Sequence, residues 1–319
     1  MNFKKFFPAA TVLIIVLFLW QNNVFTWLPE TKFVDDLISS LSPFRKAGET
    51  QFIEVPIEVD VNSEIAAEPK IELIPDVNLN LISFDVGQGL SLGIEYGNSF
   101  IVFDFGNKGK SQPINDYASG KDFEEIQLIA SHGDSDHIGG MDVLNIPYTT
   151  VYYNGDNDCT TIACQTFYNK TEGKRIVSER NSMIPFPVSL TILNPIQPRK
   201  FNSRNDNSVV LLIEFKDFQA LIMGDCEFEC EKDIIGSGLL RDVEYLSVGH
   251  HGAKSSTSKE FLKIIKPEVS VINAGKDNSY GHPHAETLIN LQEIGSRIYR
   301  TDLQGTIFLT TNGINFTVK

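Results

Sequence analysis

The chain has 319 residues, of which 42% are hydrophobic and 21% are charged. This length holds one large domain or two ordinary ones, and the composition excludes collagen-like, coiled-coil and wholly disordered chains. The 27 basic and 41 acidic side chains give a net charge of -14, which argues against a large basic face that binds duplex DNA non-specifically. An anionic substrate would therefore have to be held locally, by a metal ion or by a few directed donors.

Residues 1–28 are typical of a signal anchor. Lys4 and Lys5 precede an uncharged apolar stretch at residues 6–20, which fits a short membrane anchor or the apolar region of a signal peptide. No small-residue cleavage site follows, so we favour an uncleaved anchor with Trp20 and Trp27 at the membrane interface. The positive-inside rule then places the rest of the chain outside the cytoplasm, and cleavage would instead make it a secreted protein.

Residues 29–76 are predicted to form an acidic stalk or linker. Between Glu30 and Asp76 the sequence has 11 acidic and 4 basic side chains, which is half of the net charge of the whole chain. Pro56, Pro69 and Pro75 interrupt its short alternating pieces, and nothing in it is typical of a catalytic site.

Residues 77–319 are predicted to form one α/β domain. Short segments rich in β-branched residues and bounded by Gly, Asn or Asp predict strands at 79–84, 90–96, 100–105, 126–131, 151–153, 190–193, 209–215, 220–223, 243–248 and 269–272. Helices are predicted at 141–145, 161–169, 258–265 and 285–294, the third of them with a capping box at its start. Two groups of strands with interspersed helices indicate a layered domain.

The histidines carry the clearest functional signal, because all six lie in three close pairs: His132/His137, His250/His251 and His282/His284. Around the first pair, four potential metal ligands fall within six residues, directly after a predicted strand. A turn there can direct His132 and Asp134 to one point and Asp136 and His137 to another, as two metal ions about 3.5–4 Å apart require. Aspartates that cap a helix would explain the two acidic residues alone, but not the histidines beside them.

The stretch HGDSDHIGG at 132–140 resembles the HxHxDH motif of the metallo-β-lactamase superfamily, with Asp134 in place of the second histidine. That variant is similar to the branch that contains the C-terminal domain of the ComEC DNA-uptake proteins. Further segments match motifs of this branch in family order: DVGQG at 85–89, IVFDFG at 101–106, NDNSVVLL at 205–212, MGD at 223–225, GHHG at 249–252 and YGHPH at 280–284. The resemblance covers about three quarters of the chain, from 79 to 319.

The resemblance implies a metallo-β-lactamase-like αββα sandwich with a two-metal site. His132 and Asp134 would bind one ion, and Asp136 and His137 would bind the second. Asp225 would bridge the two ions.

The second histidine pair, His250/His251, also belongs to the implied site. His250 would complete it, although His251 could exchange roles with that residue. The family has a further histidine before the bridging aspartate, and this chain has none. Its nearest substitute in the sequence is Asp206 or Asn207.

The resemblance also implies residues that act on the substrate or behind the ligands. Asp136 and His282 are expected to be catalytic, and His282 would orient the substrate or protonate the leaving oxygen. Asp85 and Asp104 end predicted strands, where each would either accept N–H groups of a turn or support the site. For Asp104 that support would be to orient the histidines. For His284, a surface helix cap is as well supported as a role at the site.

The ligand types indicate the chemistry. Two metal ions that share a water molecule lower its pKa, so that hydroxide is available near neutral pH. Because Asp134 makes the site harder and more anionic, Mn²⁺ is expected beside Zn²⁺. Lys254 and Ser255 precede a capped helix after the second histidine pair, where they would hold a phosphate or serve as a plain helix cap.

Four cysteines form two close pairs, Cys159/Cys164 and Cys226/Cys230. An even count in an exported domain is compatible with two local disulfides. Free buried thiols and a zinc site are the alternatives.

We interpret the chain as a membrane-anchored, extracytoplasmic, metal-dependent hydrolase. The expected activity is that of a phosphodiesterase or nuclease on DNA or nucleotides, and the acidic surface favours short or single-stranded substrates. One alternative is a hydrolase of the same fold that acts on another ester or lactone. The other is an inactive binding or assembly module, suggested by the missing histidine and by Leu90, which replaces the aspartate that usually follows DVGQG.

Overall fold

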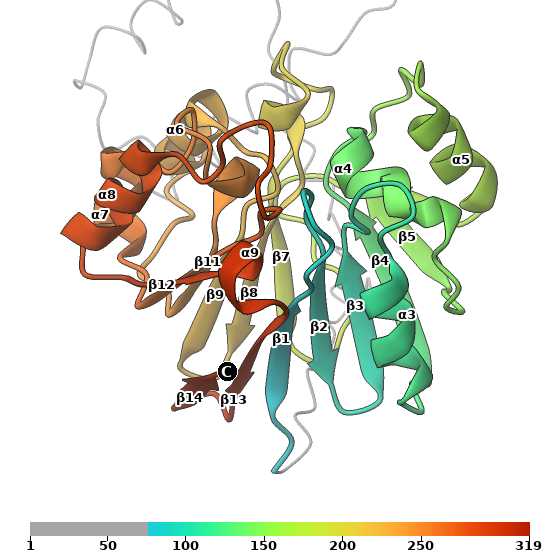
Figure 1. The fold of residues 1–319 in the computed structure, drawn as a ribbon, viewed down its shortest axis with the longest axis horizontal. Coiled ribbons are helices and arrows are strands. Elements are labelled where there is room, and N and C mark those ends of the chain that lie inside the picture. Colours follow the sequence, from blue (N-terminus) through green and yellow to red (C-terminus); the bar gives the residue numbers. More distant parts are fainter. Residues whose placement is uncertain (1–75) are drawn as a thin grey trace, which may run out of the picture. The chain divides into compact units, whose positions relative to one another are not determined.

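The computed structural model of the chain describes residues 76–319, which form two sheets packed face to face with helices on their outer faces (Figure 1). The predicted signal anchor at 1–28, and the predicted stalk at 29–76 except for its last residue, lie outside the described residues. Both stay predictions. Within 76–319, no helix combines the length and the apolar character that a membrane crossing needs.

The first sheet has eight strands in the order β14-β13-β1-β2-β3-β4-β5-β6. Strands β1 to β3 pair antiparallel, β3 to β6 pair parallel, and the C-terminal hairpin pairs with the free edge of β1. Its strands are β1 (Leu79–Ser83), β2 (Leu92–Tyr96), β3 (Ser99–Phe103), β4 (Glu125–Ala130), β5 (Thr150–Tyr153), β6 (Arg175–Val177), β13 (Ile307–Thr311) and β14 (Phe316–Val318).

The second sheet has six strands in the order β12-β11-β10-β9-β8-β7. Strands β7 to β9 pair antiparallel and β9 to β12 pair parallel. Its strands are β7 (Ser189–Asn194), β8 (Val210–Phe215), β9 (Phe218–Ile222), β10 (Tyr245–Ser247), β11 (Val269–Ile272) and β12 (Arg297–Arg300).

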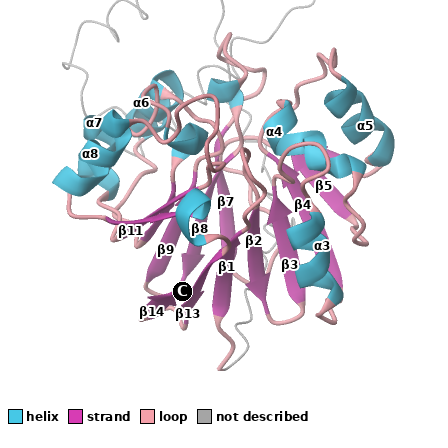
Figure 2. Ribbon diagram, viewed as in Figure 1, coloured by secondary structure: helices cyan, strands magenta, loops and turns pink. Residues whose placement is uncertain are grey.

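Helices flank both sheets (Figure 2). They are α3 (Gln112–Ser119), α4 (Ser135–Ile138), α5 (Ile162–Lys170), α6 (Phe228–Ser237), α7 (Lys259–Ile265), α8 (Ala285–Glu293) and α9 (Thr301–Gln304). Three short 3₁₀ segments join them: η2 (Gly139–Asp142), η3 (Asn205–Asn207) and η4 (Gly249–Gly252).

The strands are apolar on both faces because each sheet is covered on both sides. In β8, Leu211 points into the core between the sheets, and the next residue, Leu212, packs with the outer layer of α6, α7 and α8. In β1, Leu81 and Ile82 divide in the same way between the inner core and the layer under α3 and α5. The four layers therefore form the predicted αββα sandwich.

All ten predicted strands are present, with ends that differ by at most two residues. The helices predicted at 161–169, 258–265 and 285–294 are also confirmed, whereas the helix predicted at 141–145 is wrong. The chain there forms η2, which ends at Asp142. The Asn115 side chain accepts a hydrogen bond from the N–H of Asn145 and donates one to the carbonyl of Val143, and both groups would otherwise continue a helix.

Candidate metal centre

The predicted ligands gather at one edge of the sandwich, where loops follow the carboxyl ends of strands from both sheets. His132 and Asp134 follow β4, and Asp136 and His137 lie in α4. Asp225 follows β9, and the second histidine pair lies in η4 after β10. Because β9 and β10 pair parallel, their carboxyl ends bring these side chains to the same edge.

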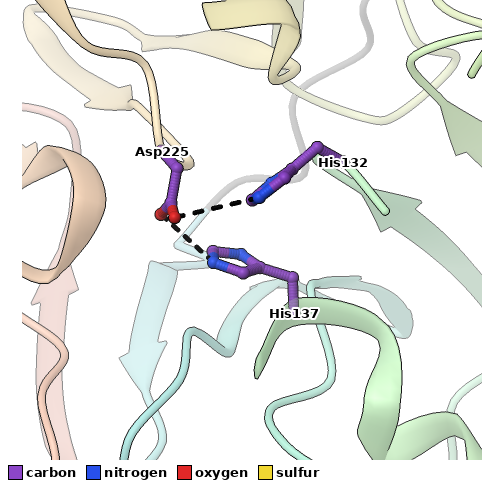
Figure 3. A group of neighbouring side chains, drawn as sticks. All are labelled: His132, His137 and Asp225. Atoms are coloured by element: carbon purple, nitrogen blue, oxygen red, sulfur yellow. Dashed lines mark ion pairs between the residues drawn. The ribbon is translucent and has the colours of Figure 1, made fainter. Parts of the chain in front are cut away.

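The two carboxylate oxygens of Asp225 face two different groups of side chains. Oδ1 lies 3.1 Å from Nε2 of His137 and 3.7 Å from Nε2 of His251. Oδ2 lies 3.8 Å from Nε2 of His132 and 3.7 Å from Nε2 of His250. Figure 3 shows Asp225 facing both His132 and His137.

Asp134 and Asp136 divide between the same two groups. Asp136 places Oδ2 3.3 Å from Nε2 of His251 and Oδ1 4.0 Å from Nε2 of His137. Asp134 places Oδ2 3.6 Å from Nε2 of His132, and its side chain is 42% exposed. One group therefore contains Asp136 with His137, and the other contains Asp134 with His132.

The two members of the second histidine pair face different groups. His251 is buried and lies with Asp136 and His137, in the position expected for His250. His250 lies on the opposite side of Asp225, with Nε2 3.7 Å from Oδ2.

Asp104 fixes the orientation of His137 from behind. It is fully buried, and its Oδ2 accepts a hydrogen bond of 2.6 Å from Nδ1 of His137. Both of its oxygens also accept hydrogen bonds from Ser131, one from the backbone N–H and one from the hydroxyl. When Nε2 gives up its proton for metal binding, the remaining proton on Nδ1 would let His137 present the lone pair of Nε2 toward Asp225.

The other three histidines near Asp225 are held in the same way, by contacts at Nδ1 that leave Nε2 directed inward. The partners and distances are Asn273 O for His251 (2.9 Å), Glu227 Oε1 for His250 (3.0 Å), and the hydroxyls of Ser131 (3.1 Å) and Ser208 (3.3 Å) for His132. The hydroxyl of Ser255 also donates to Glu227 Oε1. Sequence reasoning missed Glu227 and Asn273, because neither lies in a motif that names it as a partner of a histidine.

The donor set fits metal ions, because several of its buried polar atoms have no hydrogen-bond partner. Oδ1 of Asp225 and Nε2 of His132, His137 and His251 are buried without a hydrogen bond. Buried polar atoms are normally paired, so four such atoms directed at one region need an explanation. Two sets of three residues each offer donor atoms that all lie within 4.8 Å of one another. The first set is His132, His137 and Asp225, and the second is Asp136, His137 and His251.

The backbone around these residues is strained. His250 has φ 49° and His251 has φ 54°, both in the left-handed region, and Asp104 has φ 58°. Each such residue costs roughly 1–2 kcal/mol for a side chain with a Cβ. Strain of this kind persists where the surrounding structure imposes it, which is common at functional sites.

The cluster is electrostatically coupled. Burial alone raises the pKa of Asp225, but the charges of His137 and His251 outweigh burial and hold that pKa well below its ordinary value. Burial lowers the pKa of His137, whereas Asp225 and Asp104 raise it well above the usual range. Because metal ligands must be deprotonated, metal binding here would release protons.

His282 lies against the donor group without belonging to it. Its ring centroid is 5.5 Å from that of His250 and 6.1 Å from that of His251. Burial and the neighbouring histidines lower the pKa of His282 to about 4, so its ring is neutral near neutral pH. A neutral ring can donate one hydrogen bond to a substrate.

Asp85 and Asn207 lie outside the donor group. Asp85 accepts a hydrogen bond from the N–H of Gly87, as the turn interpretation predicts. The amide of Asn207 bonds only to the backbone of Phe201 and Ser203. Asp206, the other suggested substitute for the missing histidine, caps α6 by accepting from the N–H of Glu227 and Cys230.

Lys254 and His284 contact each other at the rim. The N–H of Lys254 donates to Nδ1 of His284, which occupies the N-cap position of α8. His284 therefore stands at the position expected for a helix cap, but its side chain makes no capping hydrogen bond.

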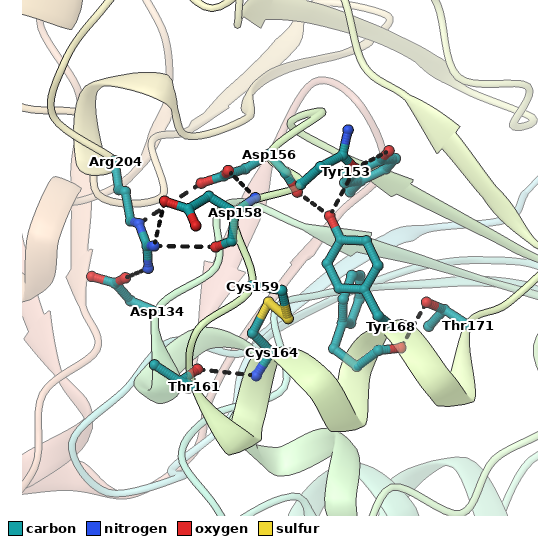
Figure 4. Close-up of a disulfide and its surroundings, with 12 residues drawn as sticks. Asp134, Tyr153, Asp156, Asp158, Cys159, Thr161, Cys164, Tyr168, Thr171 and Arg204 are labelled. Carbon is teal, nitrogen blue, oxygen red and sulfur yellow. Dashed lines mark hydrogen bonds and ion pairs between the residues drawn. A yellow bond between two sulfur atoms is a disulfide. The ribbon is translucent and has the colours of Figure 1, made fainter.

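Both cysteine pairs are disulfides, Cys159–Cys164 and Cys226–Cys230. The second follows Asp225 directly and encloses Glu227, the partner of His250. Figure 4 shows the first, beside the loop whose Asp156 and Asp158 pair with Arg204. Nη1 of Arg204 lies 3.6 Å from Oδ1 of Asp134.

The four-layer sandwich and the His/Asp cluster at its edge have the arrangement that the resemblance to the metallo-β-lactamase superfamily implies. Its sequence is similar to competence proteins of the ComEC family. It is 30% identical to competence protein ComA of Neisseria gonorrhoeae over 242 residues, 74% of this chain and 33% of that protein. It is 29% identical to ComE operon protein 3 of Bacillus subtilis over 253 residues, 70% of this chain and 32% of that protein.

The chain thus spans about a third of the length of the curated relatives that it matches. No protein-family model matches it. Among solved structures, it is similar to YhfI of Bacillus subtilis, a metallo-β-lactamase fold protein, with 10% identity and a TM-score of 0.47 over 70% of this chain and 96% of that one.

Proposed function

We propose that residues 77–319 hydrolyse phosphodiesters with two divalent metal ions, Zn²⁺ or Mn²⁺. The observation that carries the proposal is the position of Asp225, whose two oxygens face separate groups of imidazole nitrogens. A carboxylate shared in this way is what a two-metal hydrolase needs between its ions.

Each ion would have ligands from one side of Asp225. The first would be held by His132, Asp134, His250 and Asp225 Oδ2, and the second by Asp136, His137, His251 and Asp225 Oδ1. In this assignment His250 takes the place of the missing family histidine. The harder first group, with its exposed Asp134, favours Mn²⁺ beside Zn²⁺.

Bound metal ions would supply hydroxide near neutral pH and neutralise charge on the phosphate oxygens. The protein side chains position this chemistry. Asp104 and Glu227 keep two imidazoles in the tautomer that presents Nε2 inward. His282, at the edge of the donor group, would donate a hydrogen bond that orients the substrate.

DNA or nucleotides are the proposed substrate class. Support comes from the relatives, which include competence protein ComA of Neisseria gonorrhoeae, and from a donor set suited to anionic phosphate esters. The net charge of -14 favours short or single-stranded substrates over tightly bound duplexes. Attachment to a membrane through residues 6–20, with the domain outside the cytoplasm, is part of the same proposal and rests on the sequence alone.

The test measures hydrolysis of bis(p-nitrophenyl) phosphate and of single-stranded DNA by the full chain, with Mn²⁺ or Zn²⁺ added. We expect metal-dependent hydrolysis that falls at least about 100-fold in Asp136→Ala and Asp225→Ala, the range seen when a group essential to charge stabilisation is removed. Asp116→Ala is the matched control, because Asp116 is an exposed carboxylate on α3 that pairs with Gln112.

A folded chain that hydrolyses neither substrate with either metal would contradict the proposal. Hydrolysis of p-nitrophenyl acetate or a lactone in preference to both diesters would support the alternative ester hydrolase. Absence of all hydrolysis together with weak metal retention would support the binding or assembly module.

A further inference from the structure

Tyr280 is an exposed aromatic side chain at the edge of the candidate metal centre. It is 63% exposed, and it precedes His282 in the loop between β11 and α8. The two ring centroids are 5.7 Å apart and the ring planes differ by 23°, which is a stacked arrangement. One face of Tyr280 is therefore covered by His282 while much of the side chain lies in solvent.

The stacking continues inward from His282. Its ring centroid is 6.1 Å from that of His251, and these planes differ by 27°. Nε2 of His251 lies 3.3 Å from Asp136 in the donor group. Three rings in near-parallel succession therefore lead from solvent to the proposed metal ligands.

The loop that carries Tyr280 is fixed by Asn278. Its side-chain oxygen accepts hydrogen bonds from the N–H of Tyr280 (3.1 Å) and of His282 (3.0 Å). Its amide nitrogen donates to the carbonyls of Gly275 (2.9 Å) and His282 (2.6 Å). Because this turn is held at four points, a ligand that stacks on Tyr280 would lose little affinity to loop ordering.

We propose that Tyr280 is the stacking platform for a nucleobase of the substrate, a role that rests on the proposed phosphodiesterase function. A base would extend the existing stack by one ring while its phosphate reaches toward the donor group. Stacking on an aromatic side chain is tolerant of base identity and independent of positive charge. It therefore suits a protein with a net charge of -14 that must hold single-stranded DNA or a nucleotide.

The test compares two diesters with the same leaving group: thymidine 5′-(p-nitrophenyl) phosphate and methyl p-nitrophenyl phosphate. The ratio of their kcat/KM values reports what the nucleoside contributes, because contacts of the p-nitrophenyl ring cancel. Tyr280→Ala should lower this ratio about tenfold, and Tyr280→Trp should keep it within about threefold. Ile314→Ala, a 68% exposed apolar residue on the β13–β14 turn, is the control that should leave it unchanged.

A second measurement does not depend on hydrolysis. Tyr280→Trp adds a fluorophore to a chain whose two tryptophans are Trp20 and Trp27, and the parent chain supplies their background signal. Thymidine 5′-monophosphate should quench the added fluorescence, whereas deoxyribose 5-phosphate should not.

The two proposals fail in different ways. An unchanged kcat/KM ratio in Tyr280→Ala, with active enzyme, would overturn the stacking role and leave the phosphodiesterase standing. Equal quenching by both phosphates, or quenching by neither, would also overturn the stacking role. Loss of hydrolysis of both diesters by the parent chain would instead overturn the phosphodiesterase.

Discussion

At the scale of single residues, the candidate centre depends on the contacts behind each imidazole. His137 and His251 are both buried, and their Nδ1 atoms are held by Asp104 and by the carbonyl of Asn273. These contacts fix the direction of Nε2 before any ion binds, and they keep a proton on Nδ1 when Nε2 is deprotonated for metal binding. The energetic cost of arranging the donors is thus met largely by folding rather than by metal binding.

Asp104→Asn tests this arrangement. The single acceptor oxygen of the amide cannot serve both the N–H of Ser131 and Nδ1 of His137, which bond to different oxygens of Asp104, so the contact that orients the imidazole should be weakened or lost. We expect metal affinity to fall about 10- to 100-fold. Competition with a chromogenic chelator measures the affinity, and Asp116→Asn on the exposed face of α3 is the control. Unchanged affinity in Asp104→Asn would contradict the orienting role.

The DVGQG motif contributes through a close backbone approach. A Cβ on Gly89 would lie 2.4 Å from the carbonyl oxygen of Asp136, and the N–H of Leu90 donates to that same carbonyl. Leu90 itself is buried in the core between the sheets. The motif therefore supports the ligand loop through its backbone, and a leucine after it is compatible with that role.

Gly89→Ala should lower the free energy of unfolding by about 1–3 kcal/mol more than Gly87→Ala. Both glycines have positive φ, but a Cβ on Gly87 would meet nothing within 4 Å. The difference between the variants therefore reports the close contact with Asp136 together with the greater strain of a side chain at φ +146° than at +70°. Urea unfolding followed by circular dichroism measures it, and equal destabilisation of the two variants would count against the close approach.

The sequence motifs located most of the candidate site but not its internal arrangement. The spacing of His132, Asp134, Asp136 and His137 predicted two groups, and the structure places these residues in two groups. The sequence could not assign His250 and His251 to a group. Both residues have left-handed backbone conformations, which send their side chains to opposite sides of Asp225. Glu227 was missed because its role depends on a contact 23 residues along the chain.

At the scale of elements, α6 connects the donor group to α7. Its Glu231 is buried, and the carboxylate accepts hydrogen bonds from the N–H of Thr257 and of Ser258 at the start of α7. Burial raises the pKa of Glu231 to about 7, even though these hydrogen bonds favour the ionised form. The contact between Glu231 and the start of α7 therefore depends on pH, although it lies outside the metal centre.

The raised pKa sets the sign of a pH effect on stability. The folded chain holds the Glu231 proton up to about pH 7, whereas the unfolded chain releases it near pH 4.5. The free energy of unfolding should therefore fall as pH rises between these values, by up to roughly 3 kcal/mol from this residue. Glu231→Gln should flatten this slope, and Glu229→Gln on the same helix should not. Thermal unfolding from pH 4 to 8 measures it, and parallel profiles for Glu231→Gln and the parent would refute the assignment.

At the scale of the whole molecule, the sequence predicts where most strands lie but does not predict their order in the two sheets. Apolar runs such as those of β4 and β8 identify buried strands regardless of their partners. The pairing of β1 with β13 joins residues more than 200 positions apart, which no local pattern encodes. Helices α3 and α6 were missed because polar residues interrupt their apolar faces, and packing on the sheets decides their conformation.

The central claim is that Asp225 bridges two metal ions, and counting bound ions tests it most directly. The full chain is loaded with Mn²⁺ or Zn²⁺, dialysed, and analysed by plasma mass spectrometry beside Asp134→Ala and Asp225→Ala. The account predicts two ions per parent chain, one in Asp134→Ala, and fewer than one in Asp225→Ala, because both groups share the missing carboxylate. A single ion in the parent chain with either metal, or two ions retained by Asp225→Ala, would contradict it.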